Sequence, residues 1–461
     1  MTQTSTDRDS LTSIIILTHN RLAETQACVE SIRRYTKPGT YEIVVVDNNS
    51  TDGTRAWLAS QPDIHTILNN ENLGFPAGCN QGIRMARGNT IVLLNNDTVV
   101  TPRWLDNLLT CLYSADDIGA VGPVTNHACY YQAISVPYRT MEEMHQFAEQ
   151  YNHSNPQKWE RRLKLIGFCF VVKRTVLDKV GLLDERFSPG HFEDDDLSLR
   201  ILQAGYQLVL CRDTFIHHHG SATFVHRDDV QQVVATNSKK FRDKWGFDSH
   251  YSLHIRYDVL QLMNQHPRDK ELKVLEIGCA CGATLLQVRN LYPNARLYGV
   301  ELNPNAASIA TLFADVQAMD IEENIHYEKE FFDYIIFADV LEHLYDPWNV
   351  VRRFREHLAP GGVILASIPN VMHISVIRDL VNGNWNYTDV GLLDRTHVRF
   401  FTLNTIDRMF ADAGYSNREY AVNVSPLTEL DKAWVRALTN VSEHKNETLF
   451  TAYQYLCRVT K

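Results

Sequence analysis

The sequence predicts an α/β protein of two domains, because short apolar runs alternate with helix-like segments twice along the chain. The first series of runs lies at residues 13–17, 42–46, 65–68 and 90–94. The second series lies at residues 273–277, 296–300, 334–337 and 363–367. Segments with helical spacing, such as residues 24–34 and 306–313, separate the runs. Continuous apolar strands between helices are typical of buried parallel sheets, and two series predict two sheets.

The sequence also marks a boundary between the two series. Residues 230–244 have helical spacing, and this predicted helix ends before Gly246, since glycine is a frequent helix terminator. A polar, weakly patterned segment follows, and a new apolar strand opens at Lys273. We therefore expect a first domain over residues 12–247, a linker over 248–270 and a second domain over 271–425. Residues 426–461 are expected to form a C-terminal extension.

Composition and charge exclude several classes of protein. The 461 residues include 45 basic and 55 acidic side chains, and the net charge of −10 argues against a nucleic-acid-binding protein. The first ten residues are polar and lack the apolar core of a signal peptide. The longest aliphatic runs have four residues, whereas a membrane-spanning helix needs about 20. Nine scattered cysteines are typical of reduced thiols, so we expect a cytoplasmic protein.

In the first domain, polar side chains follow the predicted strands at the sheet edge where open α/β proteins bind ligands. Thr18 and Asn20 follow the first strand, and Asp47 and Asn49 follow the second. A carboxylate in the position of Asp47 can accept hydrogen bonds from a base or a ribose. The alternative is that the cluster at residues 47–52 caps a helix.

Two further polar segments suit a diphosphate. Asn72 and Gly74 precede a predicted helix whose start carries glycines spaced by four, and the amides of a helix start favour a diphosphate or allow close packing. Asn95 and Asp97 follow the fourth strand. A carboxylate flanked by amides suits a divalent ion that holds a diphosphate, although the same residues are also typical of a turn.

Two clusters of ionisable side chains occur later in the first domain. Four carboxylates, at residues 193–196, precede a helix predicted at 197–204. The helix dipole favours one or two acids there, but four are more than it requires. Their mutual repulsion should raise at least one pKa, which suits a general base. Three histidines at residues 217–219 form either a polar strand end or a source of metal ligands.

Together these segments resemble the family 2 glycosyltransferases, which have the GT-A fold. The resemblance covers residues 12–247 and rests on the order and spacing of THNR, VVVDNNSTDGT, NLGFPAGCNQGI, LLNNDT, GLLDERF, FEDDDLSLR and HHHGSATF. It implies inverting transfer of a sugar from a UDP- or dTDP-linked donor. By this likeness, the donor is bound by Thr18, Asn20, Asp47, Asn49, Asn72, Gly74 and Asn95.

The resemblance also implies a metal and a base. Asp97 would hold Mg²⁺ or Mn²⁺, because Asn95 replaces the first aspartate of the family's usual metal motif. His218 would be a second metal ligand, with His217 and His219 as alternatives. Asp194 would take the proton of the acceptor hydroxyl. Glu193 and Asp196 are the alternative bases.

In the second domain, the strand predicted at 273–277 runs into a turn of small residues, EIGCACG, which lets a ligand approach the backbone. Glu301 ends the next strand, where an acid suits the hydroxyls of a ribose. Asp320 is the next polar candidate at a strand end. Asp339 and His343 are four residues apart, so we expect them to share one face of a helix. Capping or packing is the alternative role for His343.

The strings EIGCACG, GVELN, FADVLEHL and LAPGG resemble the class I S-adenosylmethionine-dependent methyltransferases, which have a Rossmann-like fold, over residues 271–420. Dehydrogenases also combine a glycine turn with an acid, but the last two strings favour the methyltransferases. By this likeness, S-adenosylmethionine is bound by Glu276, Gly278, Gly282, Glu301 and Asp320. Ala280 departs from the family, which commonly has glycine there.

The same likeness places Asp339 and His343 on the reaction side, with His343 as the candidate base for a hydroxyl acceptor. His397 and Arg399 either line the acceptor site or form salt bridges.

The sequence therefore predicts a bifunctional enzyme that glycosylates a glycan or a lipid-linked acceptor and methylates a glycan, in surface polysaccharide biosynthesis. A lipid-linked acceptor would bring the protein to the face of the inner membrane without spanning it. One alternative is an active glycosyltransferase with a non-catalytic methyltransferase-like binding module, motivated by Ala280. The other is a non-catalytic glycan-binding scaffold, motivated by Asn95. No nucleic-acid partner is expected.

Overall fold

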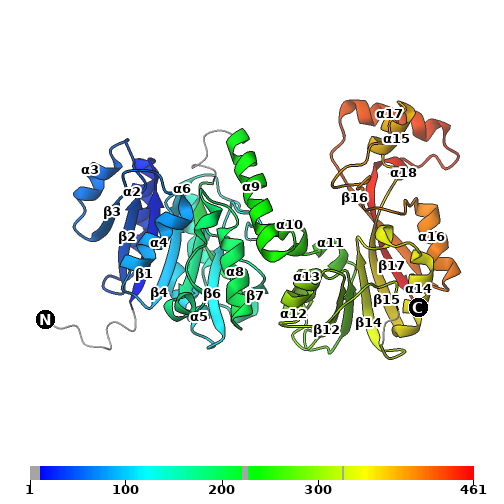
Figure 1. Ribbon diagram of the computed structural model, residues 1–461, viewed down its shortest axis with the longest axis horizontal. Coiled ribbons are helices and arrows are strands. Elements are labelled where there is room, and N and C mark those ends of the chain that lie inside the picture. Colours follow the sequence, from blue (N-terminus) through cyan, green and yellow to red (C-terminus); the bar gives the residue numbers. More distant parts are fainter. Residues whose placement is uncertain (1–10, 221–226, 324–326) are drawn as a thin grey trace. The chain divides into compact units, whose positions relative to one another are not determined.

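A computed structural model describes residues 11–220, 227–323 and 327–461, which divide into two compact units at residues 254 and 255 (Figure 1). Both units have α/β architecture, as predicted. The Ser221–Phe224 part of the HHHGSATF string lies outside the described residues. Among the residues that are described, no helix is both long enough and apolar enough to cross a bilayer.

The first unit is built on an eight-stranded mixed sheet with the order β3-β2-β1-β4-β8-β6-β9-β7. The four strands predicted from the first apolar series are confirmed and are mutually parallel: β1 (Thr12–Thr18), β2 (Tyr41–Asp47), β3 (Ile64–Leu68) and β4 (Thr90–Asn95). The rest of the sheet consists of β6 (Ile118–Val124), β7 (Trp159–Arg162), β8 (Cys169–Lys173) and β9 (Gln207–Phe215). Strand β8 runs antiparallel to both β4 and β6.

Helices pack against this sheet (Figure 1). The helices of the first unit are α2 (Leu22–Tyr35), α3 (Thr54–Ala59), α4 (Phe75–Met85), α5 (Trp104–Leu112), α6 (Met141–Tyr151), α7 (Arg174–Val180), α8 (Glu193–Gln203), α9 (Arg227–Trp245) and α10 (Ser249–Ser252). A separate two-stranded ribbon pairs β5 (Thr98–Val99) with β10 (His217–His218). This pairing sets His218 opposite Thr98, one residue after Asp97.

The second unit contains a seven-stranded sheet with the order β13-β12-β11-β14-β15-β17-β16. The predicted second series is confirmed as β11 (Lys273–Ile277), β12 (Arg296–Glu301), β14 (Phe332–Ala338) and β15 (Leu358–Pro369). The remaining strands are β13 (Asp315–Ala318), β16 (Arg418–Val424) and β17 (Ala452–Thr460). Strand β17 lies between β15 and β16 and is antiparallel to both.

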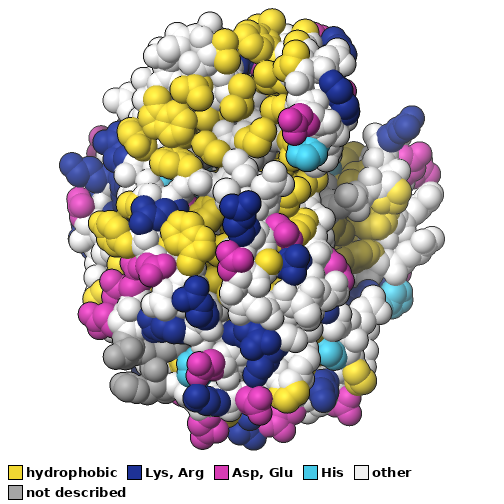
Figure 2. Space-filling model, turned by 90° about the vertical axis from the view of Figure 1, so that its right-hand side faces the viewer, with side chains coloured by type: hydrophobic (Ala, Val, Ile, Leu, Met, Phe, Trp, Pro, Cys, Tyr) yellow, Lys and Arg dark blue, Asp and Glu magenta, His cyan; other side chains and the backbone are white. Residues whose placement is uncertain are grey.

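The helices of the second unit are α11 (Tyr257–Leu260), α12 (Ala283–Leu291), α13 (Pro304–Ala310), α14 (Pro347–His357), α15 (Ile374–Val381), α16 (Leu403–Asp412), α17 (Glu429–Val441) and α18 (Thr448–Thr451). Figure 2 shows apolar side chains gathered on one face of this unit. The exposed large apolar residues of α15, α17 and the segment between α15 and residue 391 are Leu380, Val381, Trp385, Tyr387, Val390, Leu430 and Val441.

Two segments that we expected outside the second domain belong to its core. Val259 and Leu260 of α11, within the expected linker, are buried beside Leu272. Residues 452–460, within the expected extension, form β17, which lies between β15 and β16 in the sheet. The sequence pattern did not reveal this, because α11 is a single turn and β17 pairs with strands distant in sequence.

Candidate active sites

In the first unit, Asp47 lies at the carboxyl end of β2, with no exposed surface. Its Oδ2 atom accepts hydrogen bonds from the Arg55 guanidinium at 2.7 Å and from the Ser50 amide at 3.1 Å. Its Oδ1 atom is buried and has no hydrogen-bond partner among the described residues. A buried carboxylate oxygen without a partner is unfavourable, so this atom suits a ligand that donates a hydrogen bond.

The loops after β1 and β2 are joined by a short polar network. Asn20 has a φ of 60°, its amide donates to the Ser50 hydroxyl at 2.7 Å, and its side-chain oxygen accepts from the Thr51 amide at 2.8 Å. The Thr18 hydroxyl is buried and lies 2.9 Å from that of Thr25. Asn49 has a φ of 67° and is half-buried. These contacts give the two strand ends one fixed shape.

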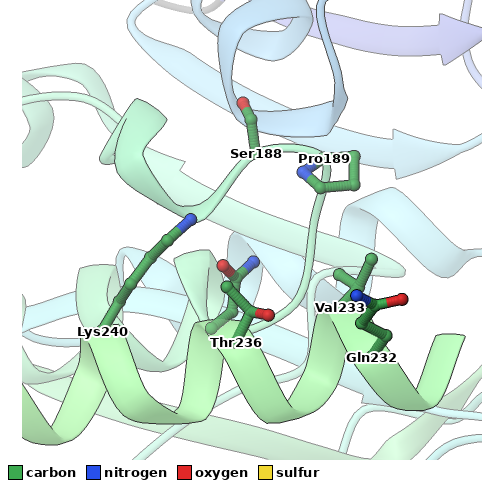
Figure 3. A pocket seen from close by; sticks show the side chains of 7 residues that line it. Ser188, Pro189, Gln232, Val233, Thr236 and Lys240 are labelled. Carbon is green, nitrogen blue, oxygen red and sulfur yellow. The ribbon is translucent and has the colours of Figure 1, made fainter. Parts of the chain in front are cut away.

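Asn72 and Gly74 shape the start of α4. The Asn72 side-chain oxygen accepts from the Gly74 amide at 3.0 Å. A Cβ atom on Gly74 would lie 2.9 Å from the Cα of Pro189, and Gly74 has a φ of 80°, so only glycine fits this turn. Pro189 also lines a pocket of about 330 Å³ with Ser188 and four residues of α9 that Figure 3 labels, Gln232, Val233, Thr236 and Lys240; Asn237 completes the lining.

Asp97 and His218 form a pair across the β5–β10 ribbon. The His218 Nε2 atom lies 3.2 Å from Oδ1 of Asp97, whose side chain is 5% exposed. The His218 Nδ1 atom donates to the backbone carbonyl of His127 at 2.8 Å, and Phe168 stacks on the ring. Asn95, two residues before Asp97, is half-buried at the end of β4. The pair therefore lies at the carboxyl edge of the sheet.

The chemistry of this pair fits a divalent metal ion. Burial alone would lower the pKa of His218, but the hydrogen bond to Asp97 and its charge raise the pKa instead. Burial alone would raise the pKa of Asp97, but His218 lowers it. Because Nδ1 of His218 is committed to a carbonyl, a metal ion would replace only the proton on Nε2 and would also bind the carboxylate.

The other two histidines have different partners. His217 is buried, its Nδ1 atom lies 2.7 Å from the Tyr138 hydroxyl, and its Nε2 atom lies 3.4 Å from Nδ1 of His219. Burial, and then the neighbouring histidines, lower the pKa of His217 to about 4. His219 is exposed. Of the three, His218 is thus the one beside Asp97.

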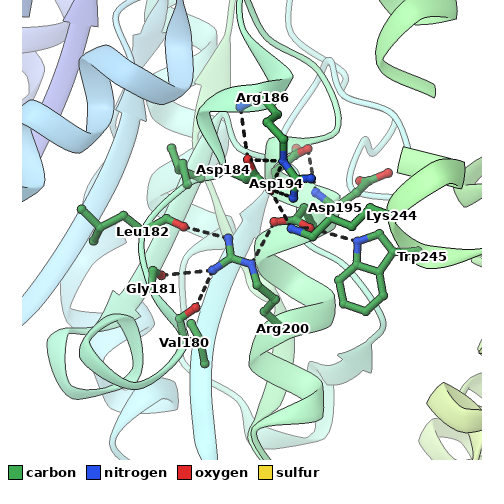
Figure 4. A network of polar contacts seen from close by, with 12 residues as sticks. Val180, Gly181, Leu182, Asp184, Arg186, Asp194, Asp195, Arg200, Lys244 and Trp245 are labelled. Carbon is green, nitrogen blue, oxygen red and sulfur yellow. Dashed lines mark hydrogen bonds and ion pairs between the residues drawn. The ribbon is translucent and has the colours of Figure 1, made fainter. Parts of the chain in front are cut away.

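Two of the four acids at the start of α8 are bound in buried ion pairs (Figure 4). Asp196 has no exposed surface and contacts Arg200 at 2.8 Å, Lys244 at 2.5 Å and the Trp245 indole at 2.9 Å. Asp195 is 4% exposed and accepts from the Lys164 ammonium at 2.9 Å. Neither carboxylate is free to receive a proton from a substrate.

Among the described residues, neither Asp194 nor Glu193 forms an ion pair. Asp194 is half-buried, and its Oδ2 atom accepts from the Gly167 amide at 2.9 Å. Burial, and then the charge of Asp195, raise the pKa of Asp194 to about 6. Glu193 is 7% exposed, and burial and the charge of Asp194 raise its pKa well above the usual value. Asp194 is therefore the most accessible of the four carboxylates.

In the second unit, the turn after β11 is shaped for close approach to the backbone. Gly278 and Gly282 have φ values of 66° and 80°, and Ala280 between them has a φ of 48°. The Ala280 amide donates to Oε2 of Glu301 at 2.8 Å, and Oε1 of Glu301 accepts from the Asn303 amide at 2.8 Å. The turn and the acid at the end of β12 are thus directly connected.

The other predicted cofactor residues differ in exposure. Glu276 is 3% exposed, and its Oε2 atom has no hydrogen-bond partner among the described residues. Burial raises the pKa of Glu276 to about 8, against the hydrogen bond from Thr284. Asp320 is exposed, and its Oδ1 atom accepts from the Glu322 amide at 2.9 Å.

The expectation that Asp339 and His343 share a helix face is wrong. Asp339 has a φ of 56° and lies before a short 3₁₀ helix, η3 (Leu341–His343), rather than within a helix. Its carboxylate accepts from the Ser367 hydroxyl at 2.8 Å and also contacts Arg256 and Gln454. The Asp339 amide also donates to the Ser367 hydroxyl at 3.0 Å, so these partners fix the position of Asp339 after β14.

Three residues near Asp339 have roles that we did not predict. Arg256 forms ion pairs with Asp258 at 2.9 Å and with Asp339, which links α11 to the end of β14. Gln454 reaches Asp339 from β17. Glu342 is 1% exposed, and neither of its carboxylate oxygens has a hydrogen-bond partner among the described residues. The sequence offered one signal for Glu342, which is that an acidic residue directly precedes His343 in FADVLEHL.

His397 and Arg399 take separate positions. The Nδ1 atom of His397 donates to the Leu392 carbonyl at 3.1 Å, and the ring lies 4.8 Å from that of His343. The Arg399 guanidinium contacts the Tyr345 carbonyl and lies over the Trp348 ring. His397 therefore belongs to the surroundings of His343.

Comparison with protein families assigns the two halves of the chain separately. Residues 13–181 match the model of "Glycosyl transferase family 2". Residues 247–420 match a model described as "Methyltransferase domain". Each match covers less than half of the chain.

Three individual relatives are similar to parts of the chain. The O-antigen biosynthesis protein RfbC of Myxococcus xanthus is 28% identical over 58% of this chain and 22% of the relative. The N-acetylglucosaminyl-diphospho-decaprenol L-rhamnosyltransferase of Mycobacterium tuberculosis is 26% identical over 43% of this chain and 73% of the relative. The ubiquinone biosynthesis O-methyltransferase of Psychrobacter arcticus is 28% identical over 34% of this chain and 64% of the relative. The chain thus spans less than a quarter of the first of these relatives.

Proposed function

We propose that this chain, which joins a family 2 glycosyltransferase domain to a methyltransferase domain, glycosylates a saccharide acceptor and methylates a glycan. The donor is a UDP- or dTDP-linked sugar, the methyl donor is S-adenosylmethionine, and the acceptor is a glycan or a lipid-linked saccharide. Surface polysaccharide biosynthesis is the proposed setting, which the likeness to an O-antigen biosynthesis protein supports.

The proposal of sugar transfer rests on the positions of Asp97, His218 and Asp194 near the consecutive residues Gly167 and Phe168. Phe168 stacks on His218 with ring centroids 5.3 Å apart, and the amide of Gly167 bonds Asp194. The pair that can hold a metal ion and the most accessible carboxylate therefore contact neighbouring residues of one short segment. Sugar transfer needs a metal ion at the diphosphate and a base nearby, and this closeness supports the proposal.

The residues of the first unit divide the reaction between them. Asp47 accepts hydrogen bonds from the nucleoside, while Asp97 and His218 would hold a divalent ion. Mg²⁺ or Mn²⁺, when bound, stabilises the negative charge of the departing diphosphate. Asp194 takes the proton of the acceptor hydroxyl as the oxygen forms its bond to the anomeric carbon and the bond to the diphosphate breaks. Attack from the face opposite the leaving group inverts the anomeric configuration.

Asp47 provides a direct test of donor binding. Asp47→Asn should weaken the binding of UDP or dTDP by about 10- to 100-fold, because a hydrogen bond to a charged group contributes about 1.5–3 kcal/mol. Calorimetry with both nucleotides measures this effect. Arg55→Gln is the matched control, since it removes the same ion pair but leaves the carboxylate available. Equal losses in the two variants would mean that binding depends on the Asp47–Arg55 ion pair, which shapes the loop, and not on a hydrogen bond from the nucleotide to Asp47.

The second activity rests on the turn at residues 278–282 and on Glu301. Glycines at positive φ let the backbone approach the methionine part of the ligand, and Glu301 accepts hydrogen bonds from ribose hydroxyls. Methyl transfer is a direct displacement at the sulfonium, so the protein mainly positions the two reactants. Asp339 and His343 lie on the acceptor side in this proposal.

The rival view, that this unit is a non-catalytic module, depends on Ala280. A φ of 48° costs alanine about 1–2 kcal/mol but still leaves its amide bonded to Glu301. We expect the wild type to bind S-adenosylhomocysteine in calorimetry, Glu301→Ala to weaken binding about 10- to 100-fold, and Ala280→Gly not to weaken it. The exposed Glu356→Gln change is the control. Binding by Ala280→Gly but not by the wild type would favour the rival view.

The exposed apolar residues of α15, α17 and the segment after α15 support a lipid-linked acceptor. Contiguous exposed apolar surface marks contact with a protein, a membrane or a ligand (Figure 2). We propose that this surface lies against the membrane or the lipid of the acceptor, so that the protein acts peripherally at the cytoplasmic face of the inner membrane.

The combined function is tested by incubating the chain with a panel of nucleotide sugars, S-adenosylmethionine and a cell glycan extract. Mass spectrometry should then show products heavier by one sugar, by one methyl group or by both. Asp194→Asn should remove only the sugar increment, and Glu301→Ala only the methyl increment. Loss of both increments in either single variant would contradict the assignment of one activity to each unit.

A further inference from the structure

Three side chains of the second unit converge outside its cofactor turn. They are Glu342 and His343, at the end of η3, and His397 in the segment before α16. One potential ligand atom from each lies within 4.8 Å of the others. The imidazole rings of His343 and His397 face each other edge to face, with centroids 4.8 Å apart and an angle of 76° between the planes.

Both histidines are oriented by carbonyl groups. The Nδ1 atom of His343 lies 3.2 Å from the Thr396 carbonyl, and the Nδ1 atom of His397 lies 3.1 Å from the Leu392 carbonyl. A carbonyl oxygen only accepts hydrogen bonds. The Thr396 hydroxyl is also 3.2 Å from Nδ1 of His343 but donates its proton to Asp394 at 2.7 Å, so Nδ1 carries the proton in both rings. In the neutral rings, each Nε2 atom therefore offers a lone pair. Such fixing of the tautomer through the distal nitrogen is the usual arrangement for a histidine that binds metal.

Glu342 supplies the third group. Its side chain is 1% exposed, and neither carboxylate oxygen has a hydrogen-bond partner among the described residues. An unpaired carboxylate in this environment is strongly unfavourable. The backbone is nevertheless fixed, because the Glu342 carbonyl accepts from the amides of Val398 and Arg399 at 2.9 and 3.0 Å. These bonds also hold the segment that carries His397 beside η3.

We propose that Glu342, His343 and His397 bind a divalent transition-metal ion through one carboxylate and two Nε2 atoms. Two imidazoles and one carboxylate are a ligand set of open metal sites, which keep a position for water or substrate. In a tetrahedral site, bonds of about 2.0–2.2 Å place the ligand atoms about 3.3–3.6 Å from each other. The ligand atoms now lie within 4.8 Å of one another, so the side chains would close by about an ångström when the ion binds.

The site adjoins the cofactor turn. A Cβ atom on Gly278 would lie 2.7 Å from a methyl of Val340, two residues before Glu342. If methyl transfer takes place here, the open position of the metal would hold the acceptor oxygen and lower its pKa, in place of a free His343 base. That extension rests on the proposed function, whereas metal binding itself does not.

The test is the metal content of the full chain. Protein freed of metal by chelation is titrated with Zn²⁺ or Mn²⁺ by calorimetry, and bound metal is counted by elemental analysis. We expect the wild type to bind one ion more per chain than Glu342→Gln and His397→Asn. The affinity at this site should fall by about 100-fold or more in each variant. Bound Co²⁺ should give a visible absorption spectrum that both variants lose.

Three controls make the result specific. Asp97→Asn affects the first unit and should leave the Co²⁺ spectrum of this site unchanged. Glu356→Gln replaces an exposed acid of the second unit and should change neither metal content nor affinity. In the Asp97→Asn background, metal should raise the melting temperature, and it should no longer do so once Glu342→Gln is added. The metal-free form of Glu342→Gln should melt at the same temperature as the metal-free wild type or at a higher one. S-adenosylhomocysteine binding, measured separately, reports the proposed function.

Equal metal content in the wild type, Glu342→Gln and His397→Asn would overturn the proposal. So would a Co²⁺ spectrum that disappears in Asp97→Asn but persists in Glu342→Gln, because the ion would then belong to the first unit. If Glu342→Gln does not fold, His397→Asn alone decides between these outcomes. Metal binding without S-adenosylhomocysteine binding would support this site while contradicting the proposed methyl transfer.

Discussion

Replacing Asp194 with asparagine is expected to lower the rate of sugar transfer by about 10²- to 10⁴-fold, the usual contribution of a positioned general base. The nucleotide should still bind, because Asp47, Asp97 and His218 are unchanged. Donor consumption and product formation, followed by mass spectrometry, measure the loss. The melting temperature should stay the same or rise, since burial makes the charge of Asp194 unfavourable at neutral pH.

The rate of sugar transfer should also depend on pH, in a direction set by the pKa of Asp194. The base acts only when it is deprotonated, and the pKa of Asp194 is raised to about 6. The rate of sugar transfer should therefore be constant above that pH and should fall about tenfold per pH unit below it. Asp178→Asn, at an exposed position of α7, is the control and should retain the wild-type rate and profile. Sugar transfer that persists in Asp194→Asn would assign the proton to another group, with Glu193 the next candidate.

Loss of the metal ion is expected to have the second large effect. Asp97→Asn, or treatment of the wild type with a chelator, should lower sugar transfer by about 10³-fold or more, because a bound ion contributes several kcal/mol of charge stabilisation. His218→Gln should raise the concentration of Mn²⁺ needed for half-maximal rate. Adding excess Mn²⁺ should restore the chelated wild type fully and Asp97→Asn hardly at all.

Two comparisons would separate this effect from a general loss of structure. Asp106→Asn lies on the exposed face of α5 and should keep both its rate and its response to Mn²⁺. The apparent affinity for Mn²⁺ should also fall as the pH is lowered, since Asp97 raises the pKa of His218 and the proton competes with the metal. Full activity of Asp97→Asn in the presence of chelator would show that transfer does not depend on a metal at this site.

The strands could be predicted because parallel buried strands are continuous apolar runs, as at residues 43–46 and 335–337. Polar residues at their carboxyl ends, such as Asp47, then mark the ligand-binding edge. The pairing of Asp97 with His218 could not be derived from spacing, because it depends on β5 and β10 meeting across more than one hundred intervening residues. The resemblance to a family suggested this pair, and the ribbon geometry brings it together.

The four acids of α8 show a different limit. The four acids are consecutive in the sequence and so share nearly the same local sequence. Asp195 nevertheless contacts Lys164, and Asp196 contacts Lys244, and neither lysine belongs to α8. The environment of each carboxylate is thus set by tertiary contacts that no local pattern contains. Glu342 escaped notice for a related reason. The spacing of four between Asp339 and His343 suggested a helix. Asp339 instead has a left-handed conformation and precedes the 3₁₀ helix η3, in which Leu341 and Glu342 are buried.

The position of β17 in the second sheet has a consequence for the order of folding. Strand β16 meets the sheet only through β17, and β17 is the last strand in sequence. Strand β16 therefore cannot attach until residues 452–460 have paired with β15, so the two strands should form as one cooperative unit. Closing a loop across such long separations is slow compared with local pairing. The strands that carry the glycine turn can thus assemble while this outer half is still unformed.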